Sequence, residues 1–138
     1  MIATETVNLE TNGNCDVVDI TRDISQAISN SSVKSGTVTI FVKGSTAGIT
    51  MIEYEPGVVN DFKDMFQRII PRDIRYEHDR AWGDGNGHSH VRASLLGFSL
   101  VLPFNDGSLV TGTWQQIVLV DFDNRPRTRQ IILQIMGE

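Results

Sequence analysis

The sequence predicts an α+β fold in one domain, and three observations support this. The 138 residues suffice for one hydrophobic core and contain no internal repeat or linker. Two segments repeat apolar residues at helical spacing, and the final third reads as short strands separated by turns. Because a strand comes first, helices are interspersed and strands close the chain, we expect a single α+β domain over residues 1–138.

The N-terminal third is predicted to contain three strands and one helix. Residues 3–9 alternate in a way that is typical of a half-buried strand. Residues 19–31 are predicted to be helical because four apolar side chains fall on one stripe: Ile20, Ile24, Ala27 and Ile28. Residues 37–43 are β-branched and aromatic, and together with residues 47–55 they are predicted to form strands.

The clearest predicted helix covers residues 56–71. Four apolar residues repeat there at helical spacing: Val58, Phe62, Met65 and Ile69. Pro56 suits the first turn and Pro71 ends the helix. Residues 72–87 are predicted to be a loop, whose length favours a functional role, and residues 90–97 a short helix.

The last third is predicted to form an antiparallel meander, with Asp106 and Gly107 as a strong hairpin signal. The predicted strands are 98–104, 108–113, 114–123 and 128–136. Trp114, near the start of one strand, is expected in the core rather than at a ligand.

Charge and composition exclude several classes of partner. The net charge of −5 argues against a nucleic-acid or anionic-membrane partner, since phosphate backbones attract basic patches. Cys15 is the only cysteine, so no intrachain disulfide forms and a reducing compartment is favoured. With no signal peptide visible and no apolar run near the ~20 residues of a membrane helix, we expect a cytoplasmic protein.

All three histidines lie in one glycine-rich stretch, at His78, His88 and His90. His88 and His90 are two residues apart, which projects both side chains to one face of an extended segment. With His78 as a third ligand, they are predicted to hold a divalent metal ion with an open coordination position. Asp79, Asp84 and Glu77 are candidates to orient the imidazoles or to serve as substitute ligands. The alternative is three solvated histidines or a helix cap.

A second candidate lies in the turn from Gly44 to Gly48, where glycines, Ser45 and Thr46 fall between two predicted strands. Backbone N–H groups and hydroxyls in such a turn are able to cradle a phosphate or carboxylate. A plain turn is the alternative, because the stretch is not a Walker A sequence.

Several motifs together resemble one known family. They are STAGIT, YEHD, HSHVRASLLGFSL and DGSLVTGTWQQ. The chain resembles the YjbQ-like family, also called secondary thiamine-phosphate synthase, from end to end. The resemblance implies a large, mostly antiparallel sheet folded into a sandwich- or barrel-like core, with two main helices and one short helix. It also implies a homotrimer with sites near subunit contacts, and a metal ion bound by histidines.

The resemblance also assigns residues. His78 and His90 match family histidines, and His88 belongs to the HSH variant of the motif. Many relatives carry a further histidine where this chain has Gly44, so His88 either compensates for it or the metal site is weakened. The ion implied is zinc, with magnesium as the alternative.

The implied activity is weak thiamine-phosphate synthesis, in which a pyrimidine diphosphate joins a thiazole phosphate and pyrophosphate leaves. Arg92 follows His90 by two residues, so in an extended entry to the helix it is predicted to face the same cavity and to clamp a phosphate together with the turn from Gly44 to Gly48. The alternative is an Arg92 that is salt-bridged to Asp79 or Glu53 and closed to ligands. Glu53 is predicted to act as a base or to bind a metal-bound water. Ser45, Thr46 and Trp82 are predicted to contact the phosphorylated or heterocyclic ligand. The alternative is a non-catalytic homo-oligomer that binds a small ligand or a metal at a structural histidine site.

Overall fold

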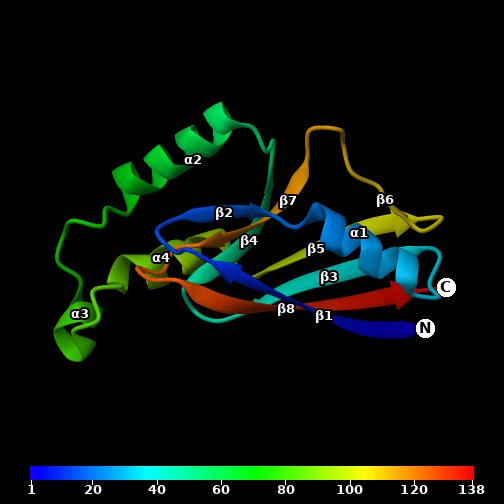
Figure 1. Cartoon of the computed structure of the whole chain (residues 1–138), viewed down its shortest axis with the longest axis horizontal. Coiled ribbons are helices and arrows are strands. Elements are labelled where there is room, and N and C mark those ends of the chain that lie inside the picture. The colour runs from blue at the N-terminus through cyan, green and yellow to red at the C-terminus, as the bar shows by residue number, and fades with distance from the viewer.

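Two antiparallel sheets form the framework of the protein, as a computed structural model of residues 1–138 shows (Figure 1). The larger sheet has, in spatial order, β1 (Ile2–Thr11), β8 (Arg127–Gly137), β3 (Gly36–Lys43), β5 (Ser99–Asn105) and β6 (Ser108–Leu109). The smaller sheet has β2 (Asp16–Asp19), β7 (Gln116–Asp121) and β4 (Ala47–Ile52). The predicted α+β fold with a curled antiparallel sheet is confirmed.

Four helices connect the strands: α1 (Thr21–Asn30), α2 (Pro56–Ile69), α3 (Glu77–Trp82) and α4 (Gly87–Leu96). The start of α2 is fixed by Glu55, whose carboxylate accepts hydrogen bonds from the backbone N–H groups of Gly57 and Val58. Pro56 occupies the first turn, where its missing N–H has no consequence. No helix is long and apolar enough to cross a membrane.

The smaller sheet is buried on both faces, which divides the apolar interior into two clusters. Alternate residues of β7, Ile117 and Leu119, pack toward the larger sheet and α1. Val118 and Val120 face the other way and pack with Phe66 of α2 and residues of α4. The layers are therefore the larger sheet, the smaller sheet and the pair of helices α2 and α4. Figure 1 shows α3 beyond one end of the sheets.

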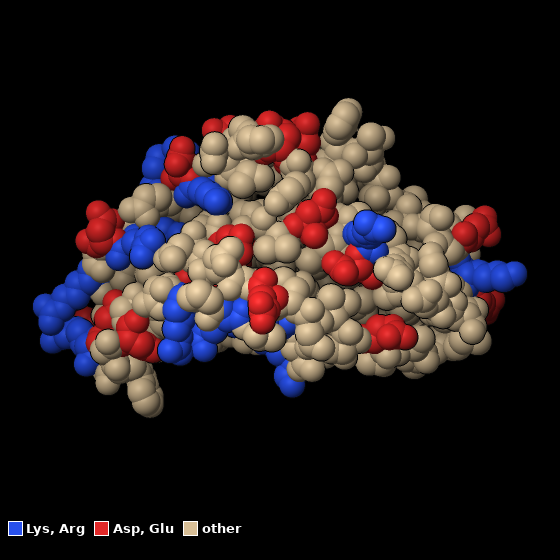
Figure 2. Space-filling view, viewed as in Figure 1, with Lys and Arg blue, Asp and Glu red and all other residues tan.

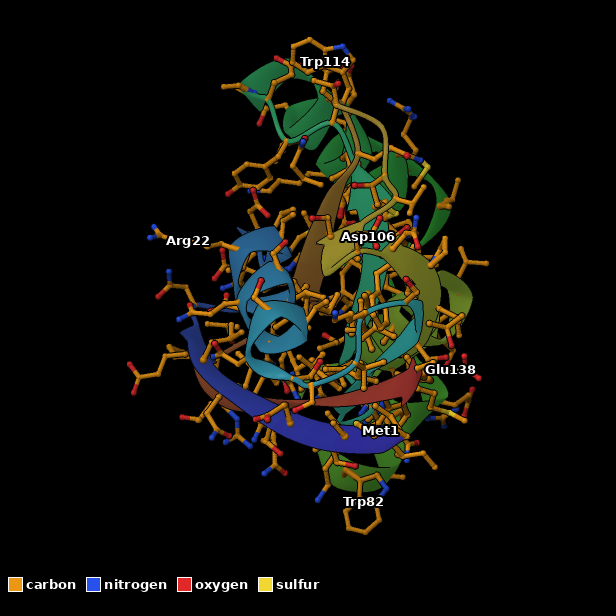
Figure 3. The ribbon with its side chains drawn as sticks, turned by 90° about the vertical axis from the view of Figure 1, so that its right-hand side faces the viewer. Met1, Arg22, Trp82, Asp106, Trp114 and Glu138 are labelled. Atoms are coloured by element: carbon orange, nitrogen blue, oxygen red, sulfur yellow. The ribbon has the colours of Figure 1, made fainter.

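The prediction of a meander in the last third is wrong. β5 and β6 do form the hairpin at Asp106 and Gly107, but β7 joins the smaller sheet and β8 returns to the larger one. Only Ser108 and Leu109 of the predicted strand 108–113 pair. Trp114, expected in the core, lies in the connection to β7 and is 70% exposed. Figure 3 places Trp114 and Trp82 at opposite ends of the molecule.

Two short elements were not predicted, and one helix begins earlier than expected. β2 has four residues and follows Asn14 and Cys15, both at positive φ. The six residues of α3 interrupt the predicted loop 72–87. α4 begins at Gly87 instead of residue 90, which places His88 inside the helix.

Candidate functional site

A pocket of about 360 Å³ lies where the turn between β3 and β4, the first residues of β8, and helices α3 and α4 meet. Its lining is almost entirely polar: Gly44, Ser45, Thr46, His78, Trp82, Asp84, Asn86, His90, Asp123, Arg127 and Arg129. Larger hollows of about 630 and 490 Å³ contain no histidine and few ionisable groups. The histidines and ionisable side chains therefore make the pocket of about 360 Å³ the candidate site. Figure 2 shows Lys and Arg side chains gathered at the end of the molecule that carries α3 and α4, with acidic side chains among them.

Two histidines face one another in this pocket. The ring centroids of His78 on α3 and His90 on α4 are 4.4 Å apart, with the rings tilted by 52°. Burial, and then the proximity of His78, lower the pKa of His90 below its ordinary value. A neutral His90 presents a lone pair to the pocket, which suits a proton acceptor or a metal ligand.

Asn86 and Asp84 hold one nitrogen of His78. Nε2 of His78 is 3.0 Å from Oδ1 of Asn86 and 3.3 Å from Oδ1 of Asp84. Rotating the Asn86 amide would offer its nitrogen to both groups instead. In the unrotated orientation the amide oxygen lies 3.2 Å from Oδ1 of Asp84, whose carboxylate is half-exposed and screened by solvent. We assign this orientation because Nδ2 then donates at 3.3 Å to the fully buried Asp123 carboxylate, toward which rotation would turn the amide oxygen. His78 then carries its proton on Nε2, and Nδ1 is free.

Two buried carboxylates bind the two arginines that line the pocket. Asp121 accepts from Nε and Nη2 of Arg129, at 2.7 and 2.9 Å. Asp123 accepts from Nε of Arg127 at 2.9 Å and from the Thr46 hydroxyl at 2.9 Å. Burial opposes ionisation of Asp123, but hydrogen bonds from the Asn124 backbone, Thr46, Asn86 and Arg127 lower its pKa on balance. The carboxylate is a fixed negative charge that orients its donors.

Five of the predicted site residues come together here: Ser45, Thr46, His78, Trp82 and His90. They come from the turn after β3 and from α3 and α4, which are far apart in the sequence. Trp82 is 77% exposed at the rim of the pocket. Such an exposed indole offers a flat apolar face for stacking.

His88 is not part of this group. The prediction that His88 and His90 share a face assumed an extended segment, and the segment is helical. Residues two apart in a helix point about 200° away from each other. His88 is only 3% exposed, its ring lies 6.2 Å from that of Tyr76, and its Nδ1 has no hydrogen-bond partner. Burial, and then the charges of Arg92 and Arg72, lower the pKa of His88 to about 4.

Arg92 and Glu53 also lie outside the pocket. The buried Arg92 guanidinium donates from Nε to the Ile70 carbonyl at 2.9 Å and from Nη2 to the amide oxygen Oε1 of Gln67 at 3.0 Å. These bonds tie α4 to the end of α2. The prediction that Arg92 lies beside His90 assumed an extended segment, and it is wrong because the segment is helical. Glu53 is exposed just after β4 and does not line the pocket.

The residues present do not fit the predicted three-histidine metal site. No three His, Cys, Asp or Glu side chains are grouped so as to hold an ion. The donor set does fit a site with two imidazoles, because Nε2 of His78 is bound to Asn86 and Asp84 in the way that orients a metal-ligating histidine. His78 and His90 would supply two nitrogens, leaving the other positions to ligand or water oxygens.

Four pocket residues were not selected from the sequence: Asn86, Asp123, Arg127 and Arg129. A signal was present in the alternation of Asp121 with Asp123 and of Arg127 with Arg129, since residues two apart in a strand share a face. The sequence did not show how closely the two segments approach each other, since β7 and β8 belong to different sheets.

The fold and the pocket define a small α+β protein with a polar site where the helices meet the ends of the strands. A family model described as UPF0047 protein YjbQ-like matches residues 5–138. The chain therefore belongs to the YjbQ-like UPF0047 family.

Relatives and solved structures agree with this assignment. A UPF0047 protein of Archaeoglobus fulgidus is 32% identical over 94% of this chain and 98% of its own length. One from Methanocaldococcus jannaschii is 37% identical over 94% of this chain and 91% of its own. The crystal structure of a YbjQ-like protein of unknown function from Sulfolobus solfataricus P2 superposes with a TM-score of 0.94 at 33% identity, covering 100% of this chain and 99% of that one.

Proposed function

We propose that the protein is an enzyme of the secondary thiamine-phosphate synthase type that binds a divalent metal ion and a small phosphorylated ligand in the His78–His90 pocket. The observation that carries this proposal is the pairing of His78 and His90, with ring centroids 4.4 Å apart, in the pocket that Ser45, Thr46 and Trp82 also line. Imidazoles, hydroxyls, guanidinium groups and an indole then surround one space of about 360 Å³. That volume suits a small molecule.

The reaction forms a carbon–nitrogen bond between the pyrimidine methylene and the thiazole nitrogen and breaks the carbon–oxygen bond to the diphosphate. Pyrophosphate leaves with the electron pair of the broken bond. A bound cation would neutralise part of the charge on that leaving group. Arg127 and Arg129 offer guanidinium donors in the same pocket. Trp82 provides a surface against which a heterocycle stacks.

Metal binding is the first step to test. Calorimetric titration with zinc, and separately with magnesium, should show a site that is lost in His78→Ala and His90→Ala. Glu53→Gln is the matched control, since Glu53 lies outside the pocket. Equal zinc affinity in all four proteins would refute a metal at these histidines.

Activity is tested separately, by following pyrophosphate release from a pyrimidine diphosphate and a thiazole phosphate. We expect a slow reaction that His90→Ala abolishes and Glu53→Gln leaves unchanged. Release at equal rates in the wild type and in His90→Ala would overturn the assignment of the reaction to this pocket.

A second candidate is a non-catalytic homo-oligomer, with a homotrimer as the specific proposal, in which the histidine site lies at a subunit contact. It is favoured by exposed apolar residues on the helices that carry His78 and His90: Trp82, Val91 and Leu95. Sedimentation equilibrium with and without zinc tests it. A trimer that forms only with zinc would support a structural metal, and a monomer at micromolar concentration under both conditions would exclude this candidate.

A further inference from the structure

The guanidinium group of Arg129 is nearly buried, yet one of its nitrogens lacks a partner. The side chain is only 8% exposed. Nε and Nη2 donate to the two oxygens of Asp121, and Nη2 also donates to the Thr46 hydroxyl at 2.6 Å. Nη1 makes no hydrogen bond within the chain, but it is not among the fully enclosed unpaired atoms. Since Arg129 lines the pocket, Nη1 remains available to a ligand there.

Gly44 leaves the space beside this nitrogen open. A Cβ atom placed on Gly44 would lie 2.7 Å from Nη1 of Arg129, well inside normal contact distance. The φ angle of Gly44 is +130°, a conformation that other residues rarely adopt. Any other side chain at this position would therefore meet the guanidinium group that Asp121 and Thr46 hold in place.

The turn that follows Gly44 supplies further donors. The backbone N–H groups of Ser45 and Thr46 find no acceptor within the chain, although the Thr46 carbonyl accepts from Phe122 at 2.9 Å. Thr46 itself is buried, and its hydroxyl is fully engaged between Arg129 and Asp123. Successive unpaired N–H groups in a turn are a common way to bind an anion. The turn and Arg129 thus bring uncommitted donors to one side of the pocket.

We infer that the turn from Gly44 to Thr46 and Nη1 of Arg129 form a subsite for a tetrahedral oxyanion, the phosphate group of the ligand. The identity of the ligand rests on the proposed function, whereas the donors of the subsite belong to this chain alone. In this subsite Arg129 supplies the guanidinium donor to phosphate that the sequence analysis had assigned to Arg92. Gly44 sets the specificity, because its missing side chain gives the oxyanion access to the guanidinium group.

Charge balance limits how tightly this subsite binds an anion. Asp121 and Asp123 compensate Arg129 and Arg127, and Asp84 adds a negative charge at the pocket. The donors therefore bind an anion through well-placed hydrogen bonds and not through a net positive charge of the pocket. Binding of free phosphate is expected to be weak, in the millimolar range, which corresponds to about −4 kcal/mol.

The test uses inorganic phosphate and metal-free full-length protein, with ³¹P NMR titration as the measurement. Gly44→Ala should weaken binding at least tenfold because the methyl group occupies the space beside Nη1. Gly97→Ala is the matched control: its φ is +100°, so the backbone is similarly strained, but a Cβ there meets nothing within 4 Å. It should bind phosphate as the wild type does. Thermal unfolding confirms that each variant is folded.

Two more variants separate the donors. Arg129→Lys keeps the charge but removes Nη1, and it should also weaken binding, provided that it is folded. Ser45→Ala keeps the backbone N–H and should bind within about twofold of the wild type. Unchanged phosphate affinity in folded Gly44→Ala would overturn the subsite, as would absence of phosphate binding to the wild type with and without zinc.

Failure of this inference and failure of the proposed function give different results. Zinc binding at His78 and His90 without phosphate binding overturns the subsite alone. Phosphate binding that Gly44→Ala weakens, in a protein that binds no zinc, supports the subsite and overturns the metal site.

Discussion

His88 and His90 are separated by one residue of α4, yet they occupy opposite environments. His90 lines the polar pocket and faces His78, whereas His88 is 3% exposed and leaves Nδ1 without a hydrogen bond. An unpaired buried nitrogen costs free energy, and protonating it would cost more because the added charge would be buried and near the positive charges of Arg92 and Arg72. The HSH motif therefore combines one site residue with one core residue.

His88 makes the stability of the protein sensitive to acid. Its pKa is about 4 in the folded chain, below the ordinary value of 6.5, so the unfolded chain binds the extra proton between these pH values. The free energy of unfolding should fall as pH decreases from 6.5 to 4, by at most about 3 kcal/mol from this group. His88→Phe should flatten that part of the curve. Calorimetric unfolding in EDTA, from pH 8 to 4, measures the effect.

The His88→Phe substitution should change the free energy of unfolding mainly between pH 6.5 and pH 4. The aromatic ring keeps the contact with Tyr76 and removes the unpaired nitrogen, so stability at pH 8 should change little or rise. A pH dependence identical to that of the wild type would show that another group binds the proton.

Arg92 is expected to support the fold and not the ligand. Arg92→Ala removes the hydrogen bonds to the Ile70 carbonyl and to Gln67 and should lower the free energy of unfolding by about 1–3 kcal/mol. Arg68→Ala is the control, because Arg68 is an exposed residue near the end of α2 and should cost under about 0.5 kcal/mol. Phosphate and zinc affinities should match the wild type in both variants. Weaker phosphate binding in Arg92→Ala alone would restore the original clamp hypothesis.

Much of the fold could be predicted because local pattern and packing agree. The helix α2 starts at Pro56 and ends before Pro71, so its ends showed in the sequence. The predicted apolar stripe is only partly right, because the buried residue of α2 is Phe66 and Ile69 of the stripe is 54% exposed. The strands β1, β3, β4, β5 and β8 likewise follow their predicted segments. Alternation does not reveal which strand is the partner, however. The unbroken apolar run from Ile117 to Val120 was the available sign that β7 is covered on both faces.

The candidate site was harder to predict because it depends on backbone conformation at a few residues. The predicted positions of His88, His90 and Arg92 assumed an extended segment, whereas the helix that begins at Gly87 keeps His90 at the pocket and turns His88 and Arg92 away from it. His78, Trp82, Ser45 and Thr46 do reach one pocket, as their motifs suggested. Asp123 and Arg127 are four residues apart and meet across one turn, a contact that the sequence could have suggested. The buried pair of Asp121 with Arg129 depends on how β7 and β8, strands of different sheets, approach each other, and no local pattern encodes that.

Asn86 is predicted to position His78. It accepts from Nε2 of His78 and donates to Asp123, so Asn86→Ala removes the group that fixes the imidazole tautomer. Zinc affinity should fall by about tenfold or more, in line with losses of orienting groups at other metal sites. Asn8→Ala, on the exposed side of β1, is the control. The ¹⁵N chemical shifts of the His78 ring report the tautomer directly, and an unaltered tautomer ratio in Asn86→Ala would disprove the positioning role.

Zinc and phosphate are predicted to strengthen each other's binding. The pocket offers the imidazoles of His78 and His90 and the carboxylate of Asp84 to a cation, and it offers the donors of Arg129 and of the turn after Gly44 to an oxyanion. A bound cation offsets the repulsion between Asp84 and the oxyanion, and a bound oxyanion offsets the repulsion between the arginines and the cation. Such coupling is reciprocal: the factor by which zinc raises phosphate affinity must equal the factor by which phosphate raises zinc affinity. We expect about fivefold to 150-fold, measured by calorimetry in both orders. Gly44→Ala should reduce the factor toward one while leaving zinc affinity without phosphate unchanged. Independent binding of the two in the wild type would mean that the ion and the oxyanion occupy separate places.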